Sequence, residues 1–146
     1  MIQDAVKEYY GETLQGSVDL KTDACATTSA PPRHVIDALA AVHPDVSARY
    51  YGCGFTIPTT LDGLNVLDLG CGAGRDVFAL AKLVGPKGHV TGVDMTDEQL
   101  AVAARHEAWH AEQFGYDAPN TRFVKGYLEQ LDDLDLEPGS FDLIVS

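Results

Sequence analysis

The sequence predicts an α/β fold built on a parallel, doubly wound β-sheet. Short apolar runs alternate with helical patterns along residues 65–145, in the order strand, helix, strand, helix, strand, loop, strand. Parallel strands need such intervening segments, because the chain must cross the sheet before it can run in the same direction again. A glycine-rich loop follows the first strand, and an acidic residue ends the second. Together these features indicate a ligand site at the carboxyl edge of the sheet.

Residues 1–62 are predicted to form a helical and loop segment that precedes the sheet-forming residues 63–146. Residues 2–14 have the pattern of a short helix. Pro31 and Pro32 suit the start of the next helix, where a missing N–H costs little. Apolar residues recur behind the two prolines at helical spacing. We therefore expect one buried helix face, made of Val35, Ile36, Leu39 and Val42.

Four strands are predicted in the sheet-forming part. Each is a short apolar run bounded by glycine, proline or polar residues, as buried parallel strands usually are. The chain ends inside the fourth run, and an uncovered apolar strand at a sheet edge favours aggregation. We therefore expect the chain to be the N-terminal portion of a longer protein, with its sheet truncated after the fourth strand. The predicted strands are 66–69, 89–94, 121–125 and 141–145.

Two helices are predicted between these strands. The first covers residues 75–84, and the glycine and proline that follow end it. The second begins after Thr96, which has the spacing of a capping box with Gln99, and it runs to about residue 114. Residues 129–137 are acidic and are predicted to form a loop. The apolar face expected of the second helix consists of Leu100, Ala104, Ala111 and Phe114.

Composition excludes several classes of function. The 146 residues are 45% hydrophobic and 22% charged, which is typical of one soluble globular domain. A net charge of −12 disfavours binding to nucleic acid and to anionic membranes. No apolar run reaches the ~20 residues that span a bilayer, and the first residues do not resemble a signal peptide. We therefore expect a cytoplasmic protein, without nucleic-acid or membrane partners, whose three cysteines are reduced thiols.

The glycine loop carries the pattern Asp-x-Gly-x-Gly-x-Gly, which starts at Asp68. Gly70, Gly72 and Gly74 allow the backbone to turn sharply and to approach a ligand without a Cβ in the way. The N-terminus of the following helix favours a negatively charged group of the ligand. Asp94 ends the second strand, where its carboxylate can accept two hydrogen bonds from ribose hydroxyls. The pattern therefore predicts a site for a ligand that carries a ribose.

The dinucleotide-binding pattern Gly-x-Gly-x-x-Gly does not fit, because its last glycine would fall on Arg75 or Val77. The loop resembles motif I of class I S-adenosylmethionine-dependent methyltransferases, whose fold is Rossmann-like. This resemblance implies S-adenosylmethionine as the cofactor and places residues 126–129 near its adenine. The cofactor-binding residues that it implies are Asp68, Gly70, Gly72, Gly74, Arg75, Asp94, Met95, Leu128 and Glu129.

A second resemblance lies in residues 22–28, 49–54, 57–58, 88–96 and 126–129. These segments resemble arsenite methyltransferases, which transfer methyl groups from S-adenosylmethionine to trivalent arsenic. Trivalent arsenic is thiophilic, and thiolates are its matching ligands. The resemblance implies that Cys53 binds arsenic and that Tyr51 and Gly52 bind the cofactor. It also implies that Cys25 acts in the thiol–disulfide step that restores trivalent arsenic, and Cys25 is a candidate second ligand. Cys71, in the glycine loop, is expected to be a small buried filler.

The same resemblance implies arsenite or its thiol conjugates as substrate, and a thiol such as glutathione or thioredoxin as reductant. The family's arsenic site uses two further cysteines that lie after residue 146. We therefore expect this chain alone to be unable to complete the reaction. Two alternatives remain open: a methyltransferase that acts on another small molecule, and a non-catalytic fragment that binds the cofactor or arsenic.

Residues 106–110 spell His-Glu-x-x-His, the motif of zinc-dependent proteases. In that reading His106 and His110 would chelate zinc, Glu107 would be the general base, and Glu129 could be a third ligand. We expect the match to be fortuitous, because the helix that carries it follows the second strand of a cofactor-binding sheet. Both histidines are expected on one flank of the apolar face, with Glu107 near its centre.

Overall fold

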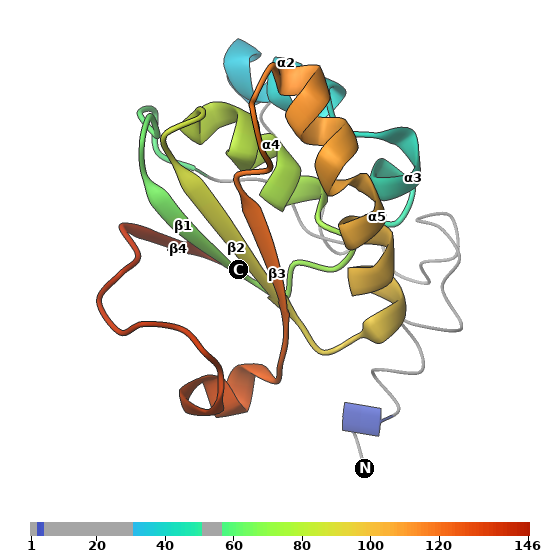
Figure 1. Ribbon diagram of the computed structural model, residues 1–146, viewed down its shortest axis with the longest axis vertical. Helices are drawn as coiled ribbons and strands as arrows, with labels where there is room; N and C mark the ends of the chain where they lie inside the picture. Colours follow the sequence, from blue (N-terminus) through green and yellow to red (C-terminus); the bar gives the residue numbers. More distant parts are fainter. Residues whose placement is uncertain (1–2, 5–30, 51–56) are drawn as a thin grey trace.

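The computed structural model describes residues 3–4, 31–50 and 57–146. Most of the helix expected over residues 2–14 and the segments that contain Cys25 and Cys53 lie outside the described residues. The described part is a parallel sheet with helices beside it (Figure 1). Its elements are α2 (Arg33–Ala40), α3 (Pro44–Ser47), β1 (Asn65–Leu69), α4 (Arg75–Val84), β2 (His89–Asp94), α5 (Asp97–Phe114), β3 (Thr121–Lys125), the 3₁₀ helix η3 (Leu128–Asp133) and β4 (Leu143–Val145).

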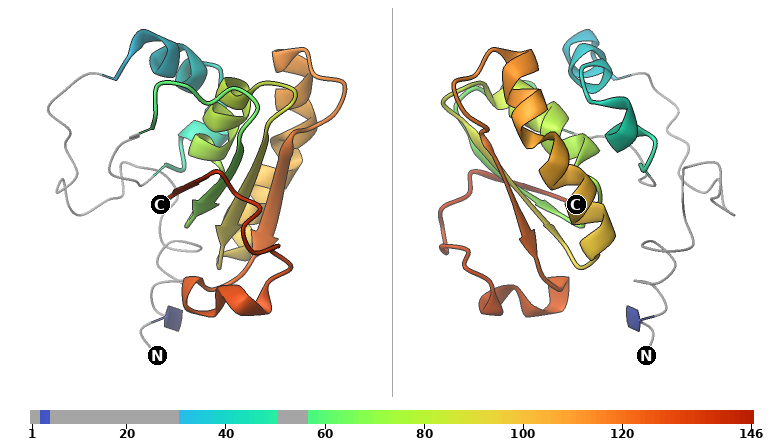
Figure 2. Two further views of the ribbon diagram at one scale, coloured as in Figure 1. Left: turned by 90° about the vertical axis from the view of Figure 1, so that its left-hand side faces the viewer. Right: turned by 45° about the vertical axis from the view of Figure 1, so that its right-hand side comes forward.

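The four strands form one parallel sheet in the order β3-β2-β1-β4. In its register Val66 of β1 lies beside Val90 of β2 on one side and Leu143 of β4 on the other. The connections through α4 and α5 both run in the same direction across the sheet, so right-handed crossovers put both helices on one face. Figure 2 shows the sheet from two directions, with the segment from η3 to β4 on the side opposite α5. The predicted fold class and all four strands are confirmed.

Helix α4 lies at the centre of the core. Its Leu80 packs in a cluster with Val66 of the sheet, and its Phe78 packs in another with Val42, which follows α2. Phe78 and Leu80 are fully buried. Burial of one such side chain contributes roughly 1.5–3 kcal/mol. Helix α4 therefore joins the sheet to the N-terminal helices, and this packing fixes the glycine loop that precedes it.

The two predicted helix faces are confirmed except at one residue each. Val35 and Val42 are buried, but Ile36 is exposed and Ala38 is buried in α2. In α5 Ala111 is buried, but Ala104 is exposed. The pattern on α5 also misses Gln99 and His110, because an apolar pattern does not count polar residues that the core buries. The buried residues of α5 are Gln99, Val102, Ala103, His110 and Ala111.

None of the described helices is both long and apolar enough to cross a bilayer.

The start of α5 also differs from the predicted capping box. Thr96 occupies the N-cap position, but its side chain makes no capping hydrogen bond. In a capping box the Gln99 side chain would accept the backbone N–H of Thr96. That N–H instead donates to Oδ1 of Asp94 at 2.8 Å. The acidic segment after β3 is likewise not a plain loop, because its first residues belong to η3.

Strand β4 lies at the edge of the described sheet, where it pairs only with β1. Its central residue, Ile144, is 58% exposed. An apolar side chain and unpaired backbone groups at a sheet edge are the features that the sequence predicts for this strand.

Candidate cofactor-binding site

Three loops meet at the carboxyl edge of the sheet, and Asp94 joins them. Its Oδ2 accepts the backbone N–H of Gly72 at 2.9 Å, and its Oδ1 accepts that of Thr96 at 2.8 Å. Its backbone carbonyl accepts the N–H of Gly126 at 3.0 Å. The loops that follow β1, β2 and β3 are therefore fixed to one residue. Each carboxylate oxygen keeps a further lone pair, which can accept a ribose hydroxyl as the sequence predicts.

Glycine is needed at the three positions of the first loop for different structural reasons. Gly70, Gly72 and Gly74 all have positive φ, at 79°, 55° and 90°. A Cβ on Gly70 or Gly72 would meet nothing within 4 Å, so these positions leave the backbone open to a ligand. A Cβ on Gly74 would lie 2.8 Å from Cζ of Phe123, so this position is required by packing.

Three carboxyl groups gather around the glycine loop. Asp68 is only 5% exposed, and burial together with the charges of Asp76 and Asp94 raises its pKa to about 7. Burial also raises the pKa of Asp76, against the effect of Arg75, whose Nε lies 2.9 Å from its Oδ1. The negative charge that Asp76 and Asp94 place beside Asp68 favours a cationic ligand group and opposes a phosphate.

Arg75 joins the N-terminal segment to the site. Its guanidinium carbon lies 3.2 Å from the centre of the Tyr50 ring, an arrangement that allows a cation–π interaction. Ile57, which begins the next described segment, packs against the core cluster that contains Cys71 of the glycine loop. The described residues on both sides of residues 51–56 therefore lie beside the site. Three predicted site residues, Tyr51, Gly52 and Cys53, are in the segment 51–56, outside the described residues.

The remaining predicted residues lie at the same edge, after β2 and β3. Met95 follows Asp94 and is half-buried. Leu128 is a large exposed apolar side chain at the start of η3, and such a surface suits the flat face of an adenine. Glu129 accepts a hydrogen bond from Nε2 of Gln3 at 3.3 Å. The sequence pattern does not single out Asp76 or Tyr50, because their contacts depend on neighbours that spacing does not reveal.

Cys71 is buried beneath the loop. Burial, followed by the charges of Asp68 and Asp94, raises the pKa of its thiol well above the usual value. A Cβ on Gly92 would lie 2.7 Å from its Sγ, so the sulfur fills the space between the loop and β2. This packing agrees with the predicted filler role.

Cys71 is therefore expected to resist alkylation in the folded protein. Iodoacetamide at about pH 8 should modify it at least ~100-fold more slowly than in urea, because the reactive form is the exposed thiolate. Mass spectrometry of the peptide that contains Cys71 measures this rate separately from the other cysteines. Equal rates in both conditions would show that the thiol is accessible in the native protein.

The His-Glu-x-x-His residues do not form a zinc-protease site. His110 is 2% exposed and stacks on Phe78, with ring centroids 3.7 Å apart. Its Nε2 accepts the backbone N–H of His43 at 3.1 Å, and its Nδ1 donates to the carbonyl of His106 at 2.7 Å. Glu107 accepts a hydrogen bond from the Thr121 hydroxyl at 2.7 Å. The expected orientation of the histidines on one flank is wrong, because His110 is part of the buried face.

His110 also predicts a pH dependence of stability. Burial lowers its pKa from 6.5 to about 4. Between these values the unfolded chain binds more protons than the folded protein, so the free energy of unfolding falls as the pH falls. Between about pH 6.5 and 4.5 the loss attributable to His110 should be roughly 2–3 kcal/mol. Urea unfolding measures it as the difference between the wild type and His110→Gln. The exposed control His34→Gln should keep the wild-type dependence.

Comparison with known proteins identifies the family. A family model described as a methyltransferase domain matches residues 60–146. The arsenite methyltransferase of Aquipseudomonas alcaligenes is 55% identical over 145 residues, which are 99% of this chain and 41% of that protein. The human arsenite methyltransferase is 47% identical over 146 residues, which are 99% of this chain and 39% of that protein. The chain thus spans about two-fifths of the length of these curated relatives.

A solved structure gives the same result. The arsenic(III) S-adenosylmethionine methyltransferase of Chlamydomonas reinhardtii is 51% identical and superposes with a TM-score of 0.76. The match covers 79% of this chain and 38% of that one. These similarities confirm the resemblance to arsenite methyltransferases that the sequence segments indicate. The family model matches more than half of the chain, and the chain therefore belongs to the methyltransferase domain family.

Proposed function

We propose that the chain binds S-adenosylmethionine at the carboxyl edge of its sheet and takes part in methyl transfer to trivalent arsenic. The binding of S-adenosylmethionine is supported by one observation: the carboxyl groups of Asp68, Asp76 and Asp94 surround the glycine loop. S-adenosylmethionine has a sulfonium and an ammonium group, and these positive charges suit an acidic site. A dinucleotide would instead bring its pyrophosphate into the same negative field.

The residues of the site have distinct tasks in this proposal. Gly70 and Gly72 leave the backbone open to the ligand, while the N-terminus of α4 favours its carboxylate. Asp94 accepts the ribose hydroxyls and holds the three loops together. Leu128 contributes an apolar surface to the adenine. When bound, the cofactor supplies an electrophilic methyl group on a positively charged sulfur.

The arsenic half of the proposal rests on the similarity to arsenite methyltransferases. Cys53 is the proposed arsenic ligand, and Cys25 is proposed for the reductive step with glutathione or thioredoxin. Cys53 is three residues from Tyr50, whose ring lies against Arg75 at the start of the cofactor helix. Arsenic held by sulfur keeps a lone pair, so the protein needs mainly to align it with the methyl group and to exclude water.

Cofactor binding is tested first with Asp94→Asn. The amide nitrogen cannot accept the hydrogen bonds that Asp94 makes to two backbone N–H groups, so the glycine loop should lose its anchor. We expect affinity for S-adenosylmethionine to fall by about tenfold to 100-fold in isothermal titration calorimetry. Asp117→Asn makes the same change of charge at an exposed position of the surface and should bind as the wild type does. Tight binding of NAD⁺ in place of S-adenosylmethionine would contradict the proposal.

The arsenic half is tested with Cys53→Ser. This variant should retain affinity for S-adenosylmethionine but lose binding of arsenite, measured as arsenic retained by the protein after desalting. Methylated arsenic, measured by chromatography with mass detection in the presence of glutathione, would show turnover. Cofactor binding without any arsenic binding would instead indicate a methyltransferase for another small molecule.

A further inference from the structure

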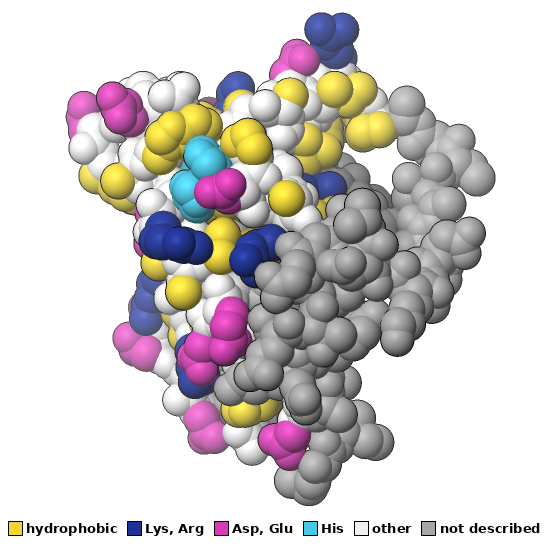
Figure 3. All heavy atoms as spheres, turned by 90° about the vertical axis from the view of Figure 1, so that its right-hand side faces the viewer, with side chains coloured by type: hydrophobic (Ala, Val, Ile, Leu, Met, Phe, Trp, Pro, Cys, Tyr) yellow, Lys and Arg dark blue, Asp and Glu magenta, His cyan; other side chains and the backbone are white. Residues whose placement is uncertain are grey.

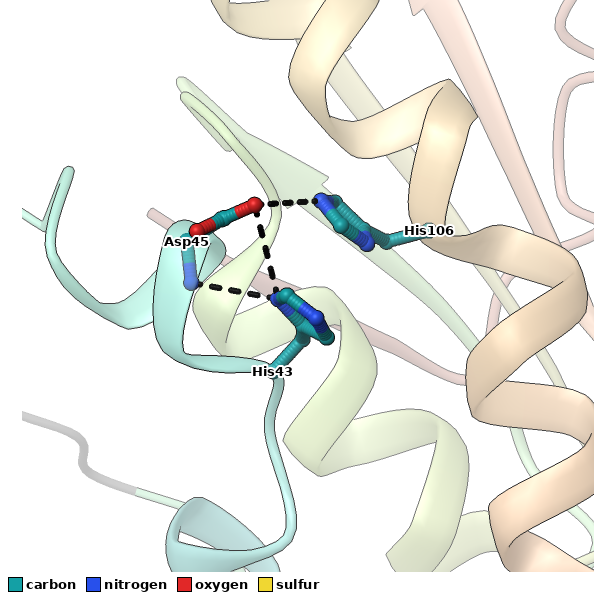
Figure 4. A group of neighbouring side chains, drawn as sticks. All are labelled: His43, Asp45 and His106. Carbon is teal, nitrogen blue, oxygen red and sulfur yellow. Dashed lines mark hydrogen bonds and ion pairs between the residues drawn. The ribbon is translucent and has the colours of Figure 1, made fainter.

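A group of side chains of the types that bind metal ions lies where α3 meets α5 (Figure 4). His43 is the N-cap of α3, Asp45 lies in the first turn of α3, and His106 lies in α5. Oδ2 of Asp45 is 3.4 Å from Nε2 of His106 and 3.9 Å from Nδ1 of His43. One ligand atom from each residue lies within 4.8 Å of the other two, the only such group of three in residues 3–4, 31–50 and 57–146.

Buried His110 positions the two histidines of this cluster. It accepts the backbone N–H of His43 at one ring nitrogen and donates to the backbone carbonyl of His106 at the other. Because Nε2 is the acceptor, the proton of the neutral ring lies on Nδ1. The rings of His43 and His106 stack with their centroids 4.0 Å apart. Folding therefore brings these side chains together before any ion binds, as a preorganised site requires.

The donor set and its spacing suit zinc. Zinc binds histidine nitrogen and carboxylate oxygen at about 2.0–2.2 Å, so tetrahedral ligand atoms lie roughly 3.3–3.5 Å apart. The two measured separations from Asp45 are close to this range. The Asp45 side chain is 69% exposed and can rotate. We propose that His43, Asp45 and His106 bind Zn²⁺ or a similar divalent transition-metal ion, with water completing the coordination.

The surroundings of the cluster are compatible with a cation. Nε2 of His106 lies 3.4 Å from the carboxylate of Asp45, so the two side chains are placed to share an ion. Arg105 opposes a cation there, whereas the net charge of −12 attracts one. Figure 3 shows histidine and carboxylate side chains side by side on the surface of this face. An ion can therefore reach the cluster from solvent.

Metal binding has a structural consequence. The Nδ1 of His43 now accepts the backbone N–H of Asp45 at 3.1 Å, and coordination at this nitrogen replaces that capping hydrogen bond. In exchange, the ion links α3 directly to α5. This site uses His106 but neither His110 nor Glu107, so it differs from a zinc-protease site. Because only the folded chain assembles the three ligands, the ion should raise the unfolding temperature.

The test is a zinc titration followed by two-dimensional NMR of the histidine ring nitrogens. One equivalent of Zn²⁺ should shift Nδ1 of His43 and Nε2 of His106 and leave those of His110 unchanged. His106→Gln and Asp45→Asn should each weaken binding by about tenfold or more in calorimetry, and each should abolish the zinc-dependent rise in unfolding temperature. His34→Gln removes an exposed histidine elsewhere and should bind zinc as the wild type does.

Cobalt distinguishes this site from binding by the cysteines. Co²⁺ bound by nitrogen and oxygen lacks the sulfur-to-metal charge-transfer band that thiolate ligands give. Such a band together with unshifted histidine signals would overturn the proposal, as would zinc affinity that survives both His106→Gln and Asp45→Asn. Circular dichroism of each variant separates a lost ligand from a lost fold.

Discussion

Replacing Gly74 with alanine is expected to lower the free energy of unfolding by about 2–5 kcal/mol. Gly74 has a φ of 90°, which strains any residue with a Cβ. The added Cβ would also lie 2.8 Å from Cζ and 2.9 Å from Cε1 of Phe123, and 3.2 Å from Cε2 of Phe78. Phe78 is fully buried, so the helix cannot yield easily. Chemical denaturation of both proteins measures the difference.

Gly139→Ala is the matched control for this prediction. Gly139 also has a positive φ, 74°, but a Cβ there would meet nothing within 4 Å. It should therefore show only the backbone strain, roughly 1–2 kcal/mol. If the two variants lose equal stability, packing against Phe123 is not what requires glycine at position 74.

Asp68→Asn is expected to stabilise the ligand-free protein while weakening its binding of S-adenosylmethionine. In the wild type the pKa of Asp68 is about 7 in the folded protein and near 4 in the unfolded chain. The folded protein therefore binds more protons between these pH values. The free energy of unfolding therefore falls as the pH rises from about 4 to 7, and the ionised group costs about 2–4 kcal/mol above that range. The amide removes this cost. Urea unfolding at about pH 8 should show the gain, relative to the exposed control Asp117→Asn.

The same carboxyl group should make cofactor affinity depend on pH. A cationic ligand favours ionised Asp68, which must lose its proton when binding occurs below about pH 7. Affinity for S-adenosylmethionine should therefore rise by up to about tenfold per pH unit below pH 7 and level off above it. In Asp68→Asn the affinity should be lower and nearly independent of pH. A wild-type affinity that does not change between about pH 6 and 8 would show that Asp68 does not sense the ligand's charge.

The sequence by itself determined the order of strands and helices, the glycine loop and the acidic residue that ends β2. These features follow from local rules: apolar runs bounded by turns, the backbone freedom of Gly70 and Gly72, and the position of Asp94 at a strand end. Such rules operate within a few residues along the chain. For that reason the four strands and helices α2, α4 and α5 could be predicted nearly in place, and the family resemblance could be recognised.

Only the tertiary structure decided which distant residues meet. It placed Phe123 against Gly74, gathered Asp68, Asp76 and Asp94 around one loop, and shows Asp94 engaged with backbone N–H groups. It buried His110, although an apolar pattern had placed that residue on the flank of the helix. The physical reason is the same in each case. Burial, charge coupling and close packing depend on the arrangement of whole elements, and spacing along one helix or strand does not specify its neighbours.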